Sequence, residues 1–205
     1  MPKNLQLKIG LVCLGLIGCG FIAALVFDVN PLARPKPESR TLDQLLVDMG
    51  VEIFPSSSSQ VEVRLPDLNG AQVNLTDFRG KIVFLNFWAT WCPTCVIEMP
   101  AMEKLHRKLK HKDFAMVSVS LQDSAAEVER FFKQNQLTFT VLLDSFGKTV
   151  SDFAIRAIPT TLILDKTGRI VGRVMGAREW DSRESIAMFK QLIDEPLVDP
   201  NENRS

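Results

Sequence analysis

The most constraining feature of this sequence is the stretch from Lys81 to Pro100, KIVFLNFWATWCPTCVIEMP. Its first part, Ile82 to Trp88, is an apolar, β-branched and aromatic run that only Asn86 interrupts, which predicts a strand buried on both faces of a sheet. A short turn follows, and Pro93 suits the first turn of a helix, where its missing N–H costs nothing. The stretch therefore predicts a central strand that leads through a turn into a helix.

Two cysteines stand at the start of this expected helix. Cys92 falls where the helix begins and Cys95 almost one turn later, so both sulfur atoms lie on one face, close enough for a disulfide. Unpaired N–H groups and the positive end of the helix dipole favour the Cys92 thiolate, and the thiolate is the attacking species in disulfide exchange. We therefore expect a redox-active disulfide in which Cys92 attacks and Cys95 resolves.

The motif resembles a known family. The run NFWATWCPTC, with Glu98 and Pro100 behind it and IPTT at Ile158 to Thr161, resembles the membrane-anchored TlpA/ResA-like branch, of redoxin or AhpC/TSA type, of the thioredoxin superfamily. The run WCPTC is also similar to cytochrome-maturation thioredoxins of the CcmG type. The likeness covers roughly residues 61 to 193, and the combined motifs are far more specific than one isolated C-x-x-C. The resemblance implies a thiol-disulfide oxidoreductase.

The pattern beyond the motif fits a thioredoxin-like α/β fold, with three layers around a central mixed β-sheet. An N-terminal β-hairpin is expected around Asn69-Gly70, and the helix and strand after Ser124 form the insertion typical of TlpA-like relatives. The elements expected after the motif helix are a strand (Phe114 to Leu121), a helix opened by Ser124 and Glu127, a strand (Thr140 to Leu143), a short helix (Lys148 to Ile155), a hairpin (Thr161 to Leu164 with Ile170 to Met175) and a helix (Asp181 to Ile193).

The N-terminal region predicts attachment to a membrane. The apolar run Ile9 to Phe27 would span about 28 Å as a helix, close to the thickness of a bilayer core. We interpret residues 1–28 as an uncleaved signal anchor and transmembrane helix. A lipobox that ends at Cys19 leaves a lipoprotein as the alternative. The expected location is the bacterial cytoplasmic membrane, crossed once, with the domain on the periplasmic or extracytoplasmic side.

Residues 29–60 predict a linker with a short amphipathic helix. Thr41 and Gln44 form a capping box and Gly50 is a stop signal, so the helix is expected to dock on the domain or on the membrane surface. Ser56 to Ser59 indicate a flexible connection. The thioredoxin-like domain is then expected at residues 61–195, followed by a disordered tail at 196–205. The apolar stripe of the helix consists of Leu42, Leu45, Leu46 and Met49.

Proton transfer is expected to involve Glu98. Asn86 stands where thioredoxins proper have a buried aspartate, so the ResA-like resemblance implies that Glu98, one turn beyond Cys95, exchanges a proton with that thiol. The alternative is a solvated helix glutamate. With the two cysteines, Glu98 completes the expected catalytic set.

The resemblance also implies a cis Ile158-Pro159 bond that faces the cysteines and keeps backbone groups free for a substrate chain. The alternative is an ordinary edge-strand or turn proline. Trp91 is expected to border the exposed sulfur. The expected substrate-binding residues are Trp91, Pro93, Thr94, Ile158 and Pro159.

The sequence leaves two alternatives to disulfide exchange. A C-x-x-C metal-binding or copper-delivery module lacks a second C-x-x-C, and His106 and His111, expected as exposed helix residues, lie about three turns or more from the sulfurs. A redoxin-type thiol peroxidase lacks its usual P-x-x-x-T-x-x-C context, because Thr90 is one place too near Cys92. We expect no metal and no cofactor.

Charge and family resemblance limit the kinds of partner that are expected. Formal net charge is +0 and no long basic run occurs, so no nucleic-acid partner is expected. We expect disulfide-containing extracytoplasmic proteins as substrates, with apocytochrome c as one client that the resemblance implies. A membrane thiol reductant of the CcdA/DsbD type would supply the electrons.

Overall fold

The computed structural model describes residue 36 and residues 39–54 and 63–196. Within these residues no helix is both long and apolar enough to cross a bilayer. The expected anchor, the serine-rich connection and the tail after residue 196 lie outside the described residues. The elements are α2 (Leu42–Asp48), β1 (Glu52–Ile53), β2 (Arg64–Pro66), β3 (Gln72–Asn74), η2 (Leu75–Phe78), β4 (Ile82–Trp88), α3 (Pro93–Leu109), β5 (Phe114–Leu121), α4 (Ala125–Asn135), β6 (Thr140–Asp144), α5 (Lys148–Asp152), β7 (Thr160–Leu164), β8 (Ile170–Met175) and α6 (Arg183–Asp194).

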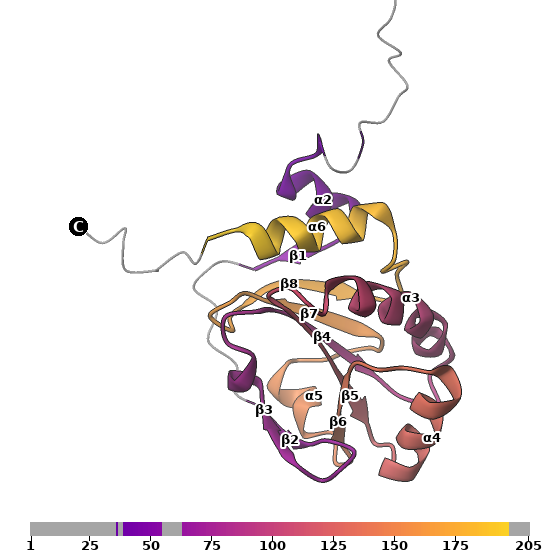
Figure 1. Cartoon of the computed structure of the whole chain (residues 1–205). Coiled ribbons are helices and arrows are strands. Elements are labelled where there is room, and N and C mark those ends of the chain that lie inside the picture. The colour runs from indigo at the N-terminus through magenta and orange to yellow at the C-terminus, as the bar shows by residue number, and fades with distance from the viewer. Residues whose placement is uncertain (1–35, 37–38, 55–62, 197–205) are drawn as a thin grey trace, which may run out of the picture. The chain divides into compact units, whose positions relative to one another are not determined.

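A six-stranded mixed sheet forms the centre of the fold, in the order β1-β8-β7-β4-β5-β6 (Figure 1). The pairs β4–β5 and β5–β6 are parallel, whereas β4–β7, β7–β8 and β1–β8 are antiparallel. The strands β2 and β3 form the expected hairpin, which a bridge between Asp67 and Leu142 joins to the β6 edge. The prediction of a thioredoxin-like α/β fold with a mixed central sheet is confirmed.

Strand β4 is buried along its whole length, as its apolar sequence predicted. Its side chains alternate between two apolar clusters: Phe84 and Trp88 enter one, and Leu85 and Phe87 enter the other. By the same alternation Asn86 points to the side of Phe84 and Trp88. A polar side chain is therefore placed at the centre of the sheet, on the face that α3 covers.

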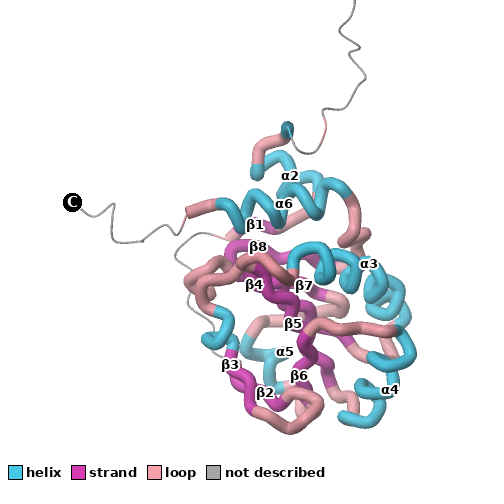
Figure 2. Tube along the Cα trace, viewed as in Figure 1, coloured by secondary structure: helices cyan, strands magenta, loops and turns pink. Residues whose placement is uncertain are grey.

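Helices cover both faces of this sheet, which gives the expected three layers (Figure 2). The cluster on one face receives Met99 of α3, Val128 of α4 and Phe189 of α6. The cluster on the other face includes Phe153, at the end of α5, and Leu65 of the hairpin. Because each face is closed by apolar packing, the polar side chain of Asn86 on β4 is fully buried.

Residues 39–54 belong to the folded unit. Thr41 and Gln44 form the predicted capping box, and the apolar stripe of α2 joins the core through the fully buried Leu45. Strand β1 then extends the sheet by pairing with β8. The helix thus docks on the domain, and the folded unit begins before residue 61, where the sequence placed the boundary.

Three local predictions differ from the structure. Helix α5 ends at Asp152 instead of continuing to Ile155, because Ala154 adopts a left-handed conformation with φ of 49°. His106 is half-buried beside the Phe139 ring, with 6.2 Å between ring centroids, and burial lowers the pKa of its imidazole. His111 follows the end of α3 and is exposed, as predicted, but it lies in a turn.

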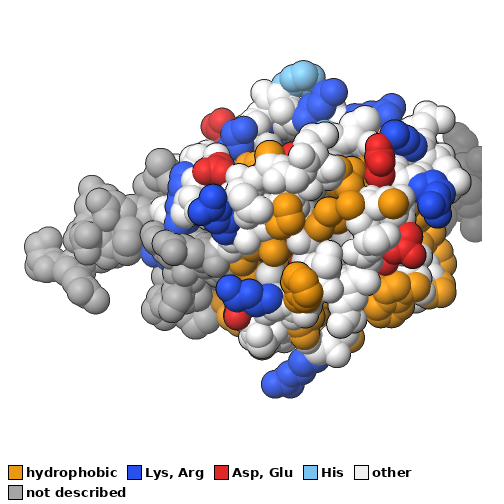
Figure 3. Space-filling model, turned by 90° about the horizontal axis from the view of Figure 1, so that it is seen from below, with side chains coloured by type: hydrophobic (Ala, Val, Ile, Leu, Met, Phe, Trp, Pro, Cys, Tyr) orange, Lys and Arg blue, Asp and Glu red, His pale blue; other side chains and the backbone are white. Residues whose placement is uncertain are grey.

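Surface charge is mixed. Figure 3 shows basic and acidic side chains interspersed on one face, with hydrophobic side chains exposed between them. Such a surface generates no strong field of one sign, in keeping with the formal net charge of +0.

The docking of α2 predicts a large effect on stability from a residue outside the expected domain. Leu45→Ala should lower the free energy of unfolding of the full-length chain by about 2–5 kcal/mol, because it removes a fully buried side chain. Urea denaturation followed by tryptophan fluorescence measures this change. Val47→Ala on the exposed side of the same helix is the matched control and should alter stability by less than about 0.5 kcal/mol. Equal effects of the two variants would contradict the docking.

Candidate active site

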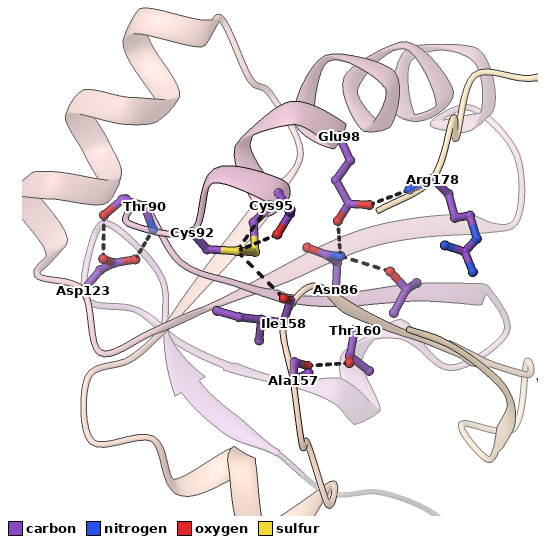
Figure 4. The surroundings of a disulfide bond; sticks show 12 residues. Asn86, Thr90, Cys92, Cys95, Glu98, Asp123, Ala157, Ile158, Thr160 and Arg178 are labelled. Atoms are coloured by element: carbon purple, nitrogen blue, oxygen red, sulfur yellow. Dashed lines mark hydrogen bonds between the residues drawn. A yellow bond between two sulfur atoms is a disulfide. The ribbon is translucent and has the colours of Figure 1, made fainter. Parts of the chain in front are cut away.

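The two motif cysteines form a disulfide at the N-terminus of α3, with their Cα atoms 5.3 Å apart (Figure 4). Cys92 is the N-cap residue, and its Sγ accepts a hydrogen bond of 3.2 Å from the Cys95 backbone N–H. Cys92 is 5% exposed, whereas Cys95 is fully buried. The two sulfurs thus differ in access to a partner, and the one at the helix end is the more accessible.

The residues expected to bind substrate surround Cys92. The Ile158-Pro159 peptide bond is cis, as the resemblance implied, and the Ile158 carbonyl oxygen lies 3.9 Å from Cys92 Sγ. Thr94 Oγ1 lies 3.4 Å from the same sulfur. Trp91 is 61% exposed, and Pro93 and Thr94 are also exposed, whereas Ile158 is half-buried and Pro159 buried. The structure therefore places Thr94 and Ile158 at the Cys92 sulfur, with Trp91 and Pro93 next to Cys92 in the chain.

Glu98 is 2% exposed, so the alternative of a solvated helix glutamate is wrong. Its Oε1 accepts a hydrogen bond of 3.0 Å from Asn86 Nδ2. Its Oε2 accepts from Trp180 Nε1 at 2.8 Å and from the Arg178 backbone N–H at 3.2 Å. Burial raises the pKa of the Glu98 carboxyl above its ordinary value, although these donors and the Arg178 charge oppose the shift. A buried carboxyl one turn from Cys95 has the properties of a proton donor and acceptor.

Asp123 is a buried residue of the site that the sequence analysis missed. Its carboxylate accepts hydrogen bonds from the Thr90 backbone N–H (2.9 Å), the Thr90 hydroxyl (2.6 Å) and the Ser120 hydroxyl (2.5 Å). Figure 4 shows Thr90 and Asp123 beside Cys92. The carboxylate therefore ties the loop before Cys92 to the end of β5. The available sequence signal was the position of Asp123 directly before Ser124, the N-cap residue of α4. That position did not indicate that the carboxylate would bind Thr90.

Removing this carboxylate should loosen the loop. Asp123→Ala leaves Thr90 and Ser120 donors without an acceptor, and one buried unsatisfied donor costs about 1–3 kcal/mol. We expect a lower urea midpoint and slower disulfide exchange. Asp152→Ala, at an exposed aspartate of α5, is the matched control and should change neither quantity. Wild-type rates in Asp123→Ala would show that the Thr90 loop needs no such clamp.

The geometry suits dithiol exchange. A disulfide at a helix N-terminus can release a Cys92 thiolate that the helix dipole stabilises, and a buried carboxyl stands nearby to handle a proton. Among the described residues no group of three or more His, Cys, Asp or Glu side chains is arranged to hold a metal ion.

Comparisons with known proteins agree with this chemistry. A model of the AhpC/TSA family matches residues 59–173. The thiol-disulfide oxidoreductase ResA from Bacillus cereus is 36% identical over 127 residues, which cover 62% of this chain and 72% of that relative.

Two solved structures share the fold. A candidate thiol:disulfide interchange protein DsbE from Chlorobium tepidum is 31% identical, with a TM-score of 0.58 and coverage of 66% of this chain and 94% of that chain. A secreted thiol-disulfide isomerase from Corynebacterium glutamicum is 26% identical, with a TM-score of 0.62 and coverage of 71% and 92%. The chain belongs to the AhpC/TSA family and is a thiol-disulfide oxidoreductase of the ResA and DsbE type.

Proposed function

We propose that this chain is a membrane-anchored, extracytoplasmic reductase of protein disulfides. The observation that supports it best is the asymmetry of the cysteine pair: Cys92, at the N-cap of α3, retains 5% exposure, whereas Cys95 is fully buried one turn inside. A substrate disulfide meets Cys92 first, so the reaction proceeds through a mixed disulfide on that residue. This order favours exchange over the peroxidase and metal-binding alternatives.

The reduced enzyme transfers two electrons in two steps. The Cys92 thiolate attacks one substrate sulfur, so the substrate S–S bond breaks, a Cys92–substrate disulfide forms and the second substrate sulfur leaves as a thiolate. Cys95 then gives its proton to Glu98 and attacks Cys92 Sγ. The enzyme disulfide forms, and the first substrate sulfur leaves as a thiolate that takes up a proton. The substrate is reduced to a dithiol and the enzyme is oxidised.

The residues around Cys92 hold the substrate chain. An extended segment that lies along Ile158 and Pro159 presents its sulfur to Cys92, because the Ile158 carbonyl oxygen is 3.9 Å from that sulfur. Main-chain pairing of this kind recognises many sequences. Trp91, Pro93 and Thr94 supply an exposed rim beside the sulfur.

The direction of electron flow is reduction. No histidine stands between the cysteines to favour a strongly oxidising thiolate, and the resemblance to the ResA-like branch supports the same direction. Equilibration of the purified protein with dithiol buffers should give a potential nearer to about −270 mV, as in thioredoxin, than to about −120 mV, as in DsbA. A value at the oxidising end, or oxidation of a reduced unfolded protein without reductase activity, would reverse the assignment.

The anchor is proposed from the apolar run Ile9 to Phe27. Carbonate should leave the full-length chain in the membrane fraction, and protease added to intact spheroplasts should degrade the catalytic domain. Palmitate labelling that is lost in Cys19→Ser would establish the lipoprotein alternative. Protection of the domain from external protease would contradict the extracytoplasmic location.

We propose apocytochrome c as a client and a membrane thiol reductant of the CcdA/DsbD type as the electron donor. The support is the resemblance of WCPTC to the cytochrome-maturation branch. Expression of Cys95→Ser in the native bacterium, followed by mass spectrometry of the trapped mixed disulfides, identifies the client. Trapped clients without any c-type cytochrome would contradict the cytochrome assignment and leave the reductase activity intact.

A further inference from the structure

The two oxygens of Glu98 have chemically different partners. The groups that bond Oε2, Trp180 Nε1–H and the Arg178 backbone N–H, can only donate hydrogen bonds. Oε1 instead faces the carboxamide of Asn86, which has both a donor and an acceptor. The partners of Oε2 can therefore only donate hydrogen bonds, whereas the partner of Oε1 can either donate or accept one.

Asn86 is arranged for the ionised form of Glu98. Its Nδ2 donates to Glu98 Oε1 and to Thr161 Oγ1, both at 3.0 Å. Its Oδ1 is buried and accepts no hydrogen bond from any described residue. The reverse orientation would direct Oδ1 at a negatively charged oxygen. The observed amide orientation, with Oδ1 unused, therefore fits an ionised Glu98.

A neutral Glu98 needs an acceptor for its proton. A proton on Oε2 would point at two N–H groups, whereas a proton on Oε1 meets an acceptor if the Asn86 amide turns by about 180°, which exchanges the positions of Nδ2 and Oδ1. The Thr161 hydroxyl accepts from Nδ2 in the first state and can rotate to donate to Oδ1 in the second. The unused acceptor of one state thus becomes the partner of the proton in the other, while Nδ2 moves to the buried position that Oδ1 leaves, so desolvation of that NH₂ group opposes the reversal.

We propose that Asn86 is a positioning residue that places the Glu98 proton on Oε1 by reversing its side-chain amide. This inference rests on the proposed acid–base role of Glu98. When Cys95 is deprotonated its S–H bond breaks and an O–H bond forms at Oε1, and the Asn86 amide reverses to accept from that O–H. Loss of the proton from Glu98 restores the observed orientation.

The groups that contact Glu98 come from two elements: Asn86 lies on β4, and Arg178 and Trp180 lie in the loop between β8 and α6. Cys95 lies one turn earlier than Glu98 on the same helix, α3 (Figure 4). Arg178 is the charged group whose Coulomb effect on Glu98 is resolved, and it favours the ionised form. Burial acts in the opposite direction and makes the neutral form accessible.

Side-chain nuclear magnetic resonance of the full-length chain in detergent tests the reversal. The Asn86 amide signals should shift with pH at the same midpoint as the Glu98 carboxyl carbon. Glu98→Gln imitates the neutral state, because its carbonyl can accept from Trp180 and its NH₂ can donate to Asn86 Oδ1. In that variant the Asn86 signals should stay at their low-pH position. Asn86 signals that do not follow the Glu98 titration would overturn the inference.

Infrared spectroscopy of the same chain locates the proton. In Asn86→Leu the carbonyl band of protonated Glu98 should shift to the higher frequency of an acid that donates no hydrogen bond, whereas Thr161→Val should leave the band unshifted. An unshifted band in Asn86→Leu would overturn the inference. If Asn86→Leu does not fold, the resonance experiment on the wild type and Glu98→Gln still decides it.

The experiments distinguish failure of the acid–base role of Glu98 from failure of the Asn86 amide reversal. If Glu98 titrates and Asn86 follows it, but the exchange rate has the same pH dependence in wild type and Glu98→Gln, the acid–base role fails while the amide reversal stands. If that pH dependence is lost in Glu98→Gln and the Asn86 signals stay fixed, the acid–base role stands and the reversal fails.

Discussion

Replacing Cys95 with serine is expected to abolish multiple turnover and to leave the enzyme attached to its substrates. Cys92, the more exposed of the two cysteines, remains at the N-cap of α3 and can still attack, but the thiolate that breaks the mixed disulfide is gone. Non-reducing gel electrophoresis should show mixed disulfides accumulating in Cys95→Ser. Cys92→Ser should also lose all turnover but form no such adducts, because its remaining thiol is fully buried.

The chain supplies matched controls for this pair. Cys13→Ser and Cys19→Ser alter the two cysteines of the N-terminal apolar run and should retain the wild-type exchange rate of the purified protein. Equal trapping by Cys92→Ser and Cys95→Ser would show that both sulfurs are attacked, contrary to their unequal exposure.

Glu98→Gln is expected to slow exchange by about 100-fold or more, the lower end of the usual contribution of a positioned acid or base. The fold should persist, since glutamine has nearly the same shape and keeps an acceptor for Trp180. The pH profile of the rate should lose the inflection that belongs to Glu98. Lys108→Gln, an exposed position on the same helix, is the control and should leave the profile unchanged. A wild-type profile in Glu98→Gln would exclude the residue from proton transfer.

The same substitution should change the pH dependence of stability. Because burial raises the pKa of Glu98, the folded chain holds a proton that the unfolded chain has already lost. The contribution of Glu98 to the free energy of unfolding is therefore fully present below the ordinary pKa of glutamate. It falls as the pH rises and is lost above the raised pKa of Glu98 in the folded chain. The difference in melting temperature, wild type minus Glu98→Gln, should decrease across that interval. A constant or rising difference would show that the pKa is not raised.

The sequence predicts features whose cause is local. Strand β4 is defined by its own apolar run, and the place of Cys92 at the start of α3 follows from the proline beside it. The contacts of Glu98 are not local, because Trp180 is 82 positions away and reaches it through the pairing of β7 with β4 and of β8 with β7. Asp123 is similar, since its partner Thr90 is 33 positions earlier in the chain.

The amphipathic pattern of α2 does not determine whether the helix packs on the protein core or on a membrane surface. The stripe that contains Leu45 would suit a membrane surface as well as a protein core, and pairing of β1 with β8 favours the core by placing the helix beside α6. Similarly, His106 has the spacing of a surface position, but packing of the Phe139 ring from the segment after α4 covers it.

The docked α2 sets the length of the proposed membrane tether. With residues 29–60 as a free linker, the fully extended chain would reach about 110 Å, whereas residues 29–39 reach at most about 40 Å. Cys92 would then be confined to a layer close to the extracytoplasmic face of the cytoplasmic membrane. If the proposed anchor holds, clients delivered to that layer by a translocation channel or by their own membrane attachment would meet the cysteine pair at a high local concentration, while proteins that diffuse freely in the compartment would rarely do so.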